Sequence, residues 1–202
     1  MSRSVSKNDP KVVAVTNQKG GVGKTTTSVN LSAALAAMHK RVLLIDLDPQ
    51  GNATVSVGLQ KGDLAATAFE LLVDQQPLSE VATPLESLGM DCVPADGDLT
   101  AAEVALLSLE DREQRLKTAL RAGEFLYDFV IIDCPPSLNM LTLNALVAAD
   151  TVTDEPKEMA TQWPTWESKT APMQEEENKF HFDYDGDYGS ERVLVTAGAA
   201  TL

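Results

Sequence analysis

The chain contains a glycine-rich run, Lys19-Gly20-Gly21-Val22-Gly23-Lys24-Thr25-Thr26, which follows a short apolar segment. Glycines let successive backbone N–H groups turn toward one anion, a lysine can reach the β- and γ-phosphates, and a threonine hydroxyl can bind Mg²⁺. The ordinary phosphate-binding pattern would place its first glycine at position 18, where this chain has Gln18. The stretch therefore predicts a variant nucleoside triphosphate loop, with Lys19 as an additional cation at its front edge.

The segments around this loop alternate between strand and helix patterns. Residues 12–16, 41–46 and 129–133 are continuous apolar runs, typical of strands that are buried on both faces of a parallel sheet. Residues 25–38, 64–73, 99–120 and 138–149 are predicted helices, and residues 90–94 are a predicted short strand. This order predicts an α/β fold with a doubly wound, mostly parallel sheet, whose functional site lies at the carboxyl ends of the strands.

Carboxylates follow two of these strands. The second strand runs into Asp46-Leu47-Asp48-Pro49-Gln50-Gly51-Asn52, and the third ends at Asp133. Phosphoryl transfer needs cations on the phosphates, a metal held in place and a carboxylate near the attacking water. Each segment also has a purely structural interpretation, because an Asp-Pro pair forms turns and an aspartate can end a strand. The three segments together favour a nucleotide site.

The composition limits the class of protein. The chain has 202 residues, 44% of them hydrophobic, which is enough for one α/β domain with a sizeable core. Its formal net charge of −14 argues against a broadly basic nucleic-acid-binding surface. No apolar run approaches the ~20 residues that span a bilayer, and the first ten residues lack the apolar centre of a signal peptide. We therefore expect a cytoplasmic protein that binds no membrane.

The cysteines and histidines do not suggest a metal centre. Cys92 and Cys134 lie in apolar segments without a C-x-x-C pattern, so we expect buried thiols. His39 and His181 have no partners at ligand spacing and are predicted surface or packing residues. Residues 183–187 resemble the start of a calcium loop, but the glycine and glutamate that such a loop needs are missing, so we expect no calcium site.

The chain changes character after about residue 152. The remainder contains both tryptophans and the acidic run Glu175-Glu176-Glu177, and it shows little amphipathic periodicity before residues 192–197. That last apolar run is a candidate replacement strand for the sheet. We expect a flexible N-terminus at residues 1–10, a nucleotide-binding domain at 11–152, and an acidic, aromatic-rich, disordered tail at 153–202.

Residues 11–152 resemble the ParA branch of the ParA/MinD family of deviant Walker A ATPases. The resemblance rests on residues 17–26, residues 46–54 and Ile132-Asp133-Cys134-Pro135-Pro136-Ser137, in the order of the family, and residues 139–150 extend it. It implies the P-loop NTPase fold and Mg²⁺-dependent ATP hydrolysis, with ATP and Mg²⁺ as cofactors.

The resemblance also implies a role for each matched residue. Lys19 is similar to the signature lysine that reaches the phosphates of the partner's ATP in a dimer, and Asp48 would position or activate the hydrolytic water. These two are the catalytic candidates. Thr25 would bind Mg²⁺ with support from Asp46 and Asp133. ATP would be held by the loop residues, namely Lys19, Gly20, Gly21, Val22, Gly23, Lys24, Thr25 and Thr26.

The partners implied by the resemblance are a second copy of the chain, non-specific DNA and a ParB-like centromere-binding protein. Together they would segregate a chromosome or plasmid, with the ATPase on the nucleoid. In the family the chain continues after residue 152 into a buried strand, and then into elements that hold adenine and contact DNA. Residues 153–157 are polar here, so we expect the sheet to be incomplete at its C-terminal end.

Two alternatives remain open at this point. One is a truncated or frameshifted remnant without catalytic activity. The other is a MinD-like ATPase that cycles on membranes. The sequence from Asp48 to Asn52 and the absence of a basic amphipathic C-terminal helix disfavour the second alternative.

Overall fold

The computed structural model describes residues 10–122 and 127–154, and the two segments 179–183 and 192–196 nearer the C-terminus. The chain divides into two compact units, Met1–Pro156 and Lys157–Leu202. In the described part of the chain, no helix is long and apolar enough to cross a membrane.

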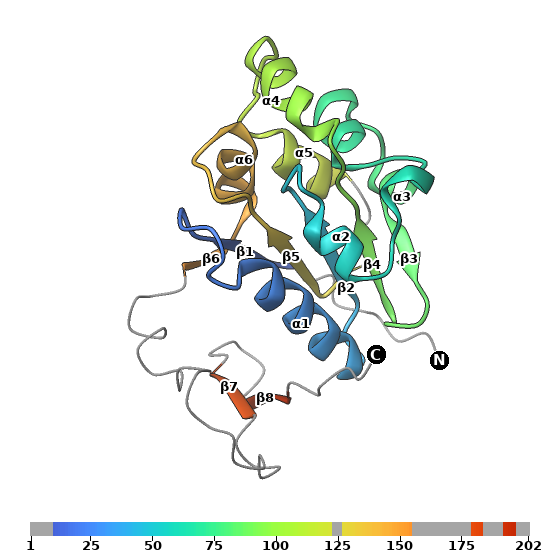
Figure 1. Cartoon of the computed structure of the whole chain (residues 1–202), viewed down its shortest axis with the longest axis vertical. Coiled ribbons are helices and arrows are strands. Elements are labelled where there is room, and N and C mark those ends of the chain that lie inside the picture. Colours follow the sequence, from blue (N-terminus) through green and yellow to red (C-terminus); the bar gives the residue numbers. More distant parts are fainter. Residues whose placement is uncertain (1–9, 123–126, 155–178, 184–191, 197–202) are drawn as a thin grey trace, which may run out of the picture. The chain divides into compact units, whose positions relative to one another are not determined.

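A six-stranded sheet runs through the first unit in the order β3-β4-β2-β5-β1-β6 (Figure 1). Neighbouring strands are parallel, except that β3 pairs antiparallel with β4 at one edge. The predicted doubly wound, mostly parallel sheet is confirmed. The strands are β1 (Lys11–Thr16), β2 (Val42–Asp46), β3 (Thr83–Leu85), β4 (Met90–Val93), β5 (Phe129–Asp133) and β6 (Thr151–Asp154).

Helices connect these strands and cover both faces of the sheet (Figure 1). They are α1 (Lys24–Ala37), α2 (Asn52–Ser56), α3 (Leu78–Val81), α4 (Leu99–Leu107), α5 (Arg115–Ala122) and α6 (Met140–Ala148). A 3₁₀ turn, η1 (Lys61–Asp63), and a π-helical segment, η2 (Glu70–Asp74), lie between α2 and α3.

The hydrophobic core consists of two clusters on opposite faces of the sheet. Leu43 and Ile45 of β2 belong to the cluster that includes α4, α5 and α6, whereas Val42 and Leu44 belong to the cluster that includes Leu35 of α1. Successive side chains of a strand point to opposite faces, so a strand covered on both sides must be apolar at every position. This double burial explains the uninterrupted apolar runs in the sequence.

The register of the sheet aligns the ends of three central strands. Asp46 of β2 lies opposite Asp133 of β5, and Asp133 lies opposite Val15 of β1 on its other side. Asp133 is therefore next to the end of β1, where the glycine-rich loop begins, and Asp46 lies one strand farther away on β2.

The predicted helix over residues 99–120 is wrong as a single element. It breaks after α4 into a turn in which Asp111 has a positive φ of 51°, and α5 begins at residue 115. The break is held from outside, because the side chain of Asn144 in α6 accepts from the N–H of Leu116 (3.1 Å) and donates to the carbonyl of Arg112 (2.7 Å). Such a tertiary contact cannot be inferred from the charge pattern of the segment.

The predicted helix over residues 64–73 is also wrong in its start. The carboxylate of Glu70 accepts hydrogen bonds from both the N–H and the hydroxyl of Thr67 (2.7 and 2.9 Å), which fixes the start of the helical turn at that residue. The turn then continues as the π-helical segment η2.

Near the C-terminus, residues 151–154 and 192–196 differ from what the sequence predicts. The chain adds a strand to the sheet after Asp150, since β6 pairs in parallel with β1 from Thr151 to Asp154, and this strand includes the first two residues of the polar stretch 153–157. An edge strand needs backbone partners on one side only, and its side chains can remain polar. Residues 192–196 form β8 (Arg192–Thr196), but this strand pairs antiparallel with β7 (Lys179–Asp183) in a separate sheet and does not extend the main one.

Three smaller expectations can also be compared with the structure. Cys92 and Cys134 are free and buried, as predicted. His39 is exposed just beyond α1. The remainder of the rejected calcium loop, from Tyr184 onward, lies outside the described residues.

Candidate nucleotide-binding site

The glycine-rich loop joins the carboxyl end of β1 to the N-terminus of α1. Gly21 and Gly23 adopt positive φ angles of 72° and 96°, a conformation that favours glycine. No side chain caps the N-terminus of α1, and its first turn carries no acidic residue. A helix N-terminus presented by a glycine-rich loop attracts anions through its backbone N–H groups and its dipole.

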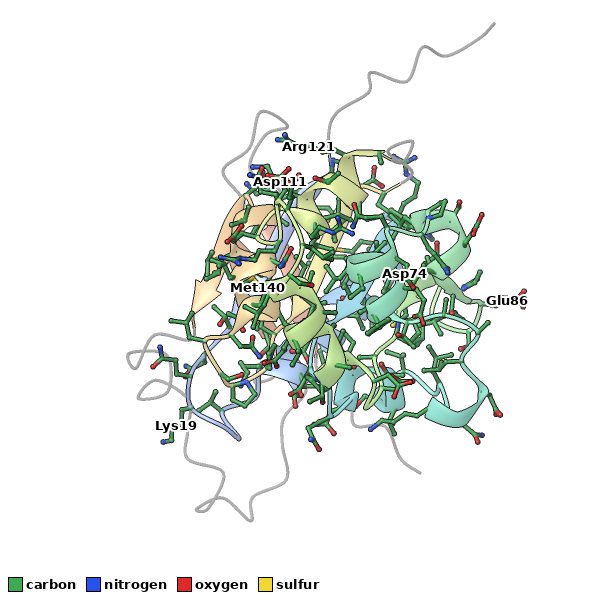
Figure 2. All side chains as sticks on the ribbon, turned by 90° about the horizontal axis from the view of Figure 1, so that it is seen from above. Lys19, Asp74, Glu86, Asp111, Arg121 and Met140 are labelled. Atoms are coloured by element: carbon green, nitrogen blue, oxygen red, sulfur yellow. The ribbon has the colours of Figure 1, made fainter. Side chains whose placement is uncertain are left out.

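The two lysines of the loop point in different directions. Lys24 is buried, and its ammonium group donates across the loop to the carbonyl of Lys19 (3.4 Å). The side chain of Lys19 is exposed and projects away from the domain (Figure 2). Its backbone N–H donates to the side chain of Asn17 (2.9 Å), which holds the front of the loop in place.

The first helical turn of α1 is hydrogen-bonded to β5 through one carboxylate. The hydroxyl of Thr25 donates to Oδ2 of Asp133 (2.8 Å), and the hydroxyl of the buried Ser28 donates to Oδ1 (2.9 Å). Burial raises the pKa of Asp133, and these two hydrogen bonds oppose that shift. Ser28 was not among the predicted site residues. Its position three residues after Thr25, on the same face of a predicted helix, is the signal that would have found it.

Thr25 and Asp133 are a suitable pair of oxygen ligands for Mg²⁺. The ion prefers oxygen ligands in octahedral geometry, and it is usually held by one or two protein groups together with substrate phosphates and water. Among the residues that the structure describes, no three His, Cys, Asp or Glu side chains gather into a metal-binding cluster. The site therefore fits a metal that arrives with phosphates better than a metal bound by protein ligands alone.

Asp46 is hydrogen-bonded to a different segment from Asp133. Its Oδ2 accepts from the N–H and the hydroxyl of Thr54 (both 2.8 Å), and its Oδ1 accepts from the N–H of Asp48 (3.1 Å). Burial raises the pKa of Asp46 to about 7, although the bonds from Thr54 oppose the shift, and the nearby charge of Asp133 adds to it. The structure thus brings Thr25 together with Asp133, and Asp46 together with the segment that carries Asp48.

Asp48 lies in a tight turn after β2. Its Oδ1 accepts from the N–H of Gln50 (2.9 Å), and its carbonyl accepts from the N–H of Gly51 (2.7 Å). Gly51 has a positive φ of 57°, and a Cβ at this position would stand 2.5 Å from the carbonyl oxygen of Ala95. Only a glycine fits here, so the turn that presents Asp48 is sterically defined.

The first strand of a parallel sheet leads through a glycine-rich loop into a helix, and a carboxylate at the end of another strand accepts a hydrogen bond from a threonine of that helix. These features define the P-loop NTPase class. The additional lysine at the front of the loop marks the deviant Walker A variant. The model of the AAA domain family matches residues 10–161, and the chain belongs to this family.

Individual relatives are of the ParA/Soj type. The chain is 54% identical over 144 residues to the sporulation initiation inhibitor protein Soj of Bacillus subtilis, and 50% identical over 142 residues to the chromosome partitioning protein ParA of Myxococcus xanthus. Each alignment covers 70% of this chain, but only 56% of Soj and 50% of ParA. The predicted resemblance is confirmed, and the chain spans about half the length of the curated relatives it matches.

A solved structure with nucleotide bound has the same fold. It is described as cobyrinic acid a,c-diamide synthase of Mycobacterium smegmatis with a bound ATP analogue and magnesium. The TM-score is 0.69 at 46% sequence identity, over 72% of this chain and 59% of the other. A fold of this kind, with this level of identity, therefore holds a nucleotide and magnesium in at least one relative.

Proposed function

We propose that this chain is an Mg²⁺-dependent ATPase of the ParA type that acts in DNA partitioning. The observation that carries the proposal is the hydrogen bond of 2.8 Å between Thr25 and Asp133, directly behind a loop that also contains the buried Lys24. This geometry joins the phosphate-binding end of a helix to a carboxylate, as Mg²⁺-assisted phosphoryl transfer requires.

In this proposal the loop binds the triphosphate and prepares it for hydrolysis. The backbone of residues 20–25 and the ammonium group of Lys24 hold the phosphates. Thr25 and Asp133 hold Mg²⁺, which would neutralise charge on the β- and γ-phosphates when bound. Asp46 supports this arrangement from β2. Asp48, at the turn after β2, orients the attacking water.

We also propose that two copies of the chain assemble into a dimer. Lys19 projects from the loop away from its own domain, and we propose that it reaches the ATP of a second copy of the chain. The partitioning names of the relatives support a dimer that binds DNA non-specifically, responds to a ParB-like protein and acts on the nucleoid in the cytoplasm.

The test is ATP turnover by the full chain with Mg²⁺, with and without DNA and the ParB-like protein. We expect turnover by the wild type that DNA and the partner increase, and a loss of at least about tenfold in Asp48→Ala with ATP binding retained. Lys19→Ala should bind ATP but fail to form the ATP-dependent dimer, as measured by light scattering. Wild-type turnover no greater than that of Asp48→Ala would contradict the proposal.

A further inference from the structure

We infer that Thr54 is a positioning residue for ATP hydrolysis, which fixes the backbone at Asp48 through the carboxylate of Asp46. The inference rests on the proposed function, because it assumes that Asp48 orients the attacking water. In the described structure, Thr54 forms no hydrogen bond with a residue of the phosphate loop. We nevertheless expect it to have a measurable effect on the rate of the reaction.

The hydroxyl of Thr54 is held in one orientation. Thr54 is fully buried in the middle of α2, and its Oγ1 accepts from the N–H of Ala95, just beyond β4 (2.8 Å). Since this acceptor position is filled by a fixed backbone donor, the hydroxyl proton points the other way, to Oδ2 of Asp46 (2.8 Å). The backbone N–H of Thr54 donates to the same oxygen (2.8 Å). Thr54 therefore fixes one oxygen of Asp46 with two hydrogen bonds.

The other oxygen of Asp46 connects Thr54 to the turn that carries Asp48. Oδ1 accepts from the N–H of Asp48 (3.1 Å), and the side chain of Asp48 in turn accepts from the N–H of Gln50 (2.9 Å). The ammonium group of Lys61 donates to the carbonyl of Gln50 and holds the far side of the turn. A continuous chain of hydrogen bonds thus leads from the end of β4 through Thr54 and Asp46 to Asp48.

Because this series of hydrogen bonds is buried, it is sensitive to the loss of one hydroxyl group. Asp46 is fully buried, and a buried carboxylate that loses a donor must move or find another partner. Any rotation of Asp46 shifts the N–H of Asp48, to which it is bonded. A displacement of about 1 Å in a group that orients a reactant can lower the rate of a reaction by about a hundredfold.

The test compares Thr54→Val, which removes the hydroxyl and keeps the shape, with Thr54→Ser, which keeps the hydroxyl. The chain offers a matched control in Thr67, a buried threonine whose hydroxyl also donates to a carboxylate (Glu70, 2.9 Å) and accepts from a backbone N–H (Phe69, 3.1 Å). Thr67→Val therefore measures the effect of losing such a hydroxyl away from the turn at Asp48.

We expect Thr54→Val to lower kcat by at least about tenfold while the KM for Mg²⁺-ATP stays within about threefold of the wild-type value. Thr54→Ser and Thr67→Val should keep kcat within about threefold of the wild type. Equal effects of Thr54→Val and Thr67→Val on kcat, or a failure of Thr54→Ser to retain activity, would overturn the inference. If Thr54→Val does not fold, Thr54→Ala replaces it, since it removes the hydroxyl and adds no bulk.

A second readout does not depend on activity. Native-state hydrogen exchange of the peptide that covers residues 47–51 should be faster in Thr54→Val than in the wild type, and unchanged in Thr67→Val, with β5 as the internal reference. Absent turnover in the wild type would refute the proposed function, while the exchange measurement would still decide whether Thr54 orders the turn. Unchanged exchange of that peptide in Thr54→Val would overturn the inference.

Discussion

At the scale of single residues, Asp46 and Asp133 show how neighbouring carboxylates acquire different tasks. They lie opposite each other on β2 and β5 and are both fully buried. Asp133 accepts from hydroxyls of α1, whereas Asp46 accepts from α2 and from the turn at Asp48. The two carboxylates therefore differ in the segments that they hold: Asp133 is bonded to the first turns of α1, and Asp46 is bonded to α2 and to the turn at Asp48.

The raised pKa of Asp46 leads to a prediction about stability and pH. The pKa is 3.8 in the unfolded reference and about 7 in the folded chain, so between these values the folded state binds more protons. The free energy of unfolding should then fall as the pH rises through this window, by at most about 1.4 kcal/mol per pH unit. Asp46→Asn removes this contribution, so its stability relative to the wild type should improve steadily between about pH 4 and about pH 7.

Urea unfolding of both proteins across that range measures the effect. A difference in unfolding free energy between Asp46→Asn and wild type that is independent of pH would show that Asp46 does not titrate in this window. Asp128, whose pKa is lowered by its hydrogen bond with Arg41 on the surface, offers a control. Asp128→Asn should leave the pH dependence above about pH 5 unchanged.

At the scale of secondary-structure elements, the sequence is most informative where an element is buried on both faces. Strands β1, β2 and β5 could be predicted, over residues 12–16, 41–46 and 129–133, because a doubly covered sheet requires uninterrupted apolar runs. The break between α4 and α5 could not be predicted, since it depends on the distant Asn144. β6 was missed because an edge strand imposes no apolar pattern on its sequence.

The turn between β2 and α2 gives a prediction at this scale. Gly51→Ala should destabilise the chain by about 1–3 kcal/mol more than Gly89→Ala, because the new Cβ would meet the carbonyl oxygen of Ala95 at 2.5 Å. Gly89 has a similar positive φ of 65° but open space around it, so it measures only the cost of the backbone conformation. Chemical denaturation of both variants makes the comparison. Equal destabilisation would mean that the turn can open without cost.

At the scale of the whole molecule, the two units on either side of residue 156 differ in how much of their structure and chemistry could be predicted from the sequence. Motifs that carry chemistry lie in the first unit. Lys24, Thr25 and Asp133 could be selected as candidates from spacing and context, whereas the catalytic roles expected of Lys19 and Asp48 rest on the family resemblance. Thr54 could not be selected, because a threonine on a helix has no distinctive pattern until its partner is known. Ser28 could have been found only by its position three residues after Thr25 on the same face of the predicted helix. The placement of β8 in a separate sheet likewise depends on its pairing with β7, which an isolated apolar run does not reveal.

The same division predicts that the first unit folds by itself. In the described part of the chain, no residue of either hydrophobic cluster lies beyond Ala149. A chain that ends after Pro156 should therefore unfold cooperatively, with a Tm within about 4 °C of the full-length value, a shift that corresponds to about 1 kcal/mol for a domain of this size. Thermal denaturation followed by circular dichroism measures this. Loss of the cooperative transition would mean that residues 157–202 are required for the fold.

A calorimetric titration of the full chain with a non-hydrolysable ATP analogue measures whether residues 19–26 and Asp133 form an Mg²⁺-ATP site. We expect binding that requires the triphosphate, that is strengthened by Mg²⁺, and that weakens by at least about tenfold in Lys24→Ala. Thr25→Val should lose the strengthening by Mg²⁺ while it still binds the nucleotide. Absent binding, or equal affinity in the wild type and Lys24→Ala, would show that these residues do not form an Mg²⁺-ATP site.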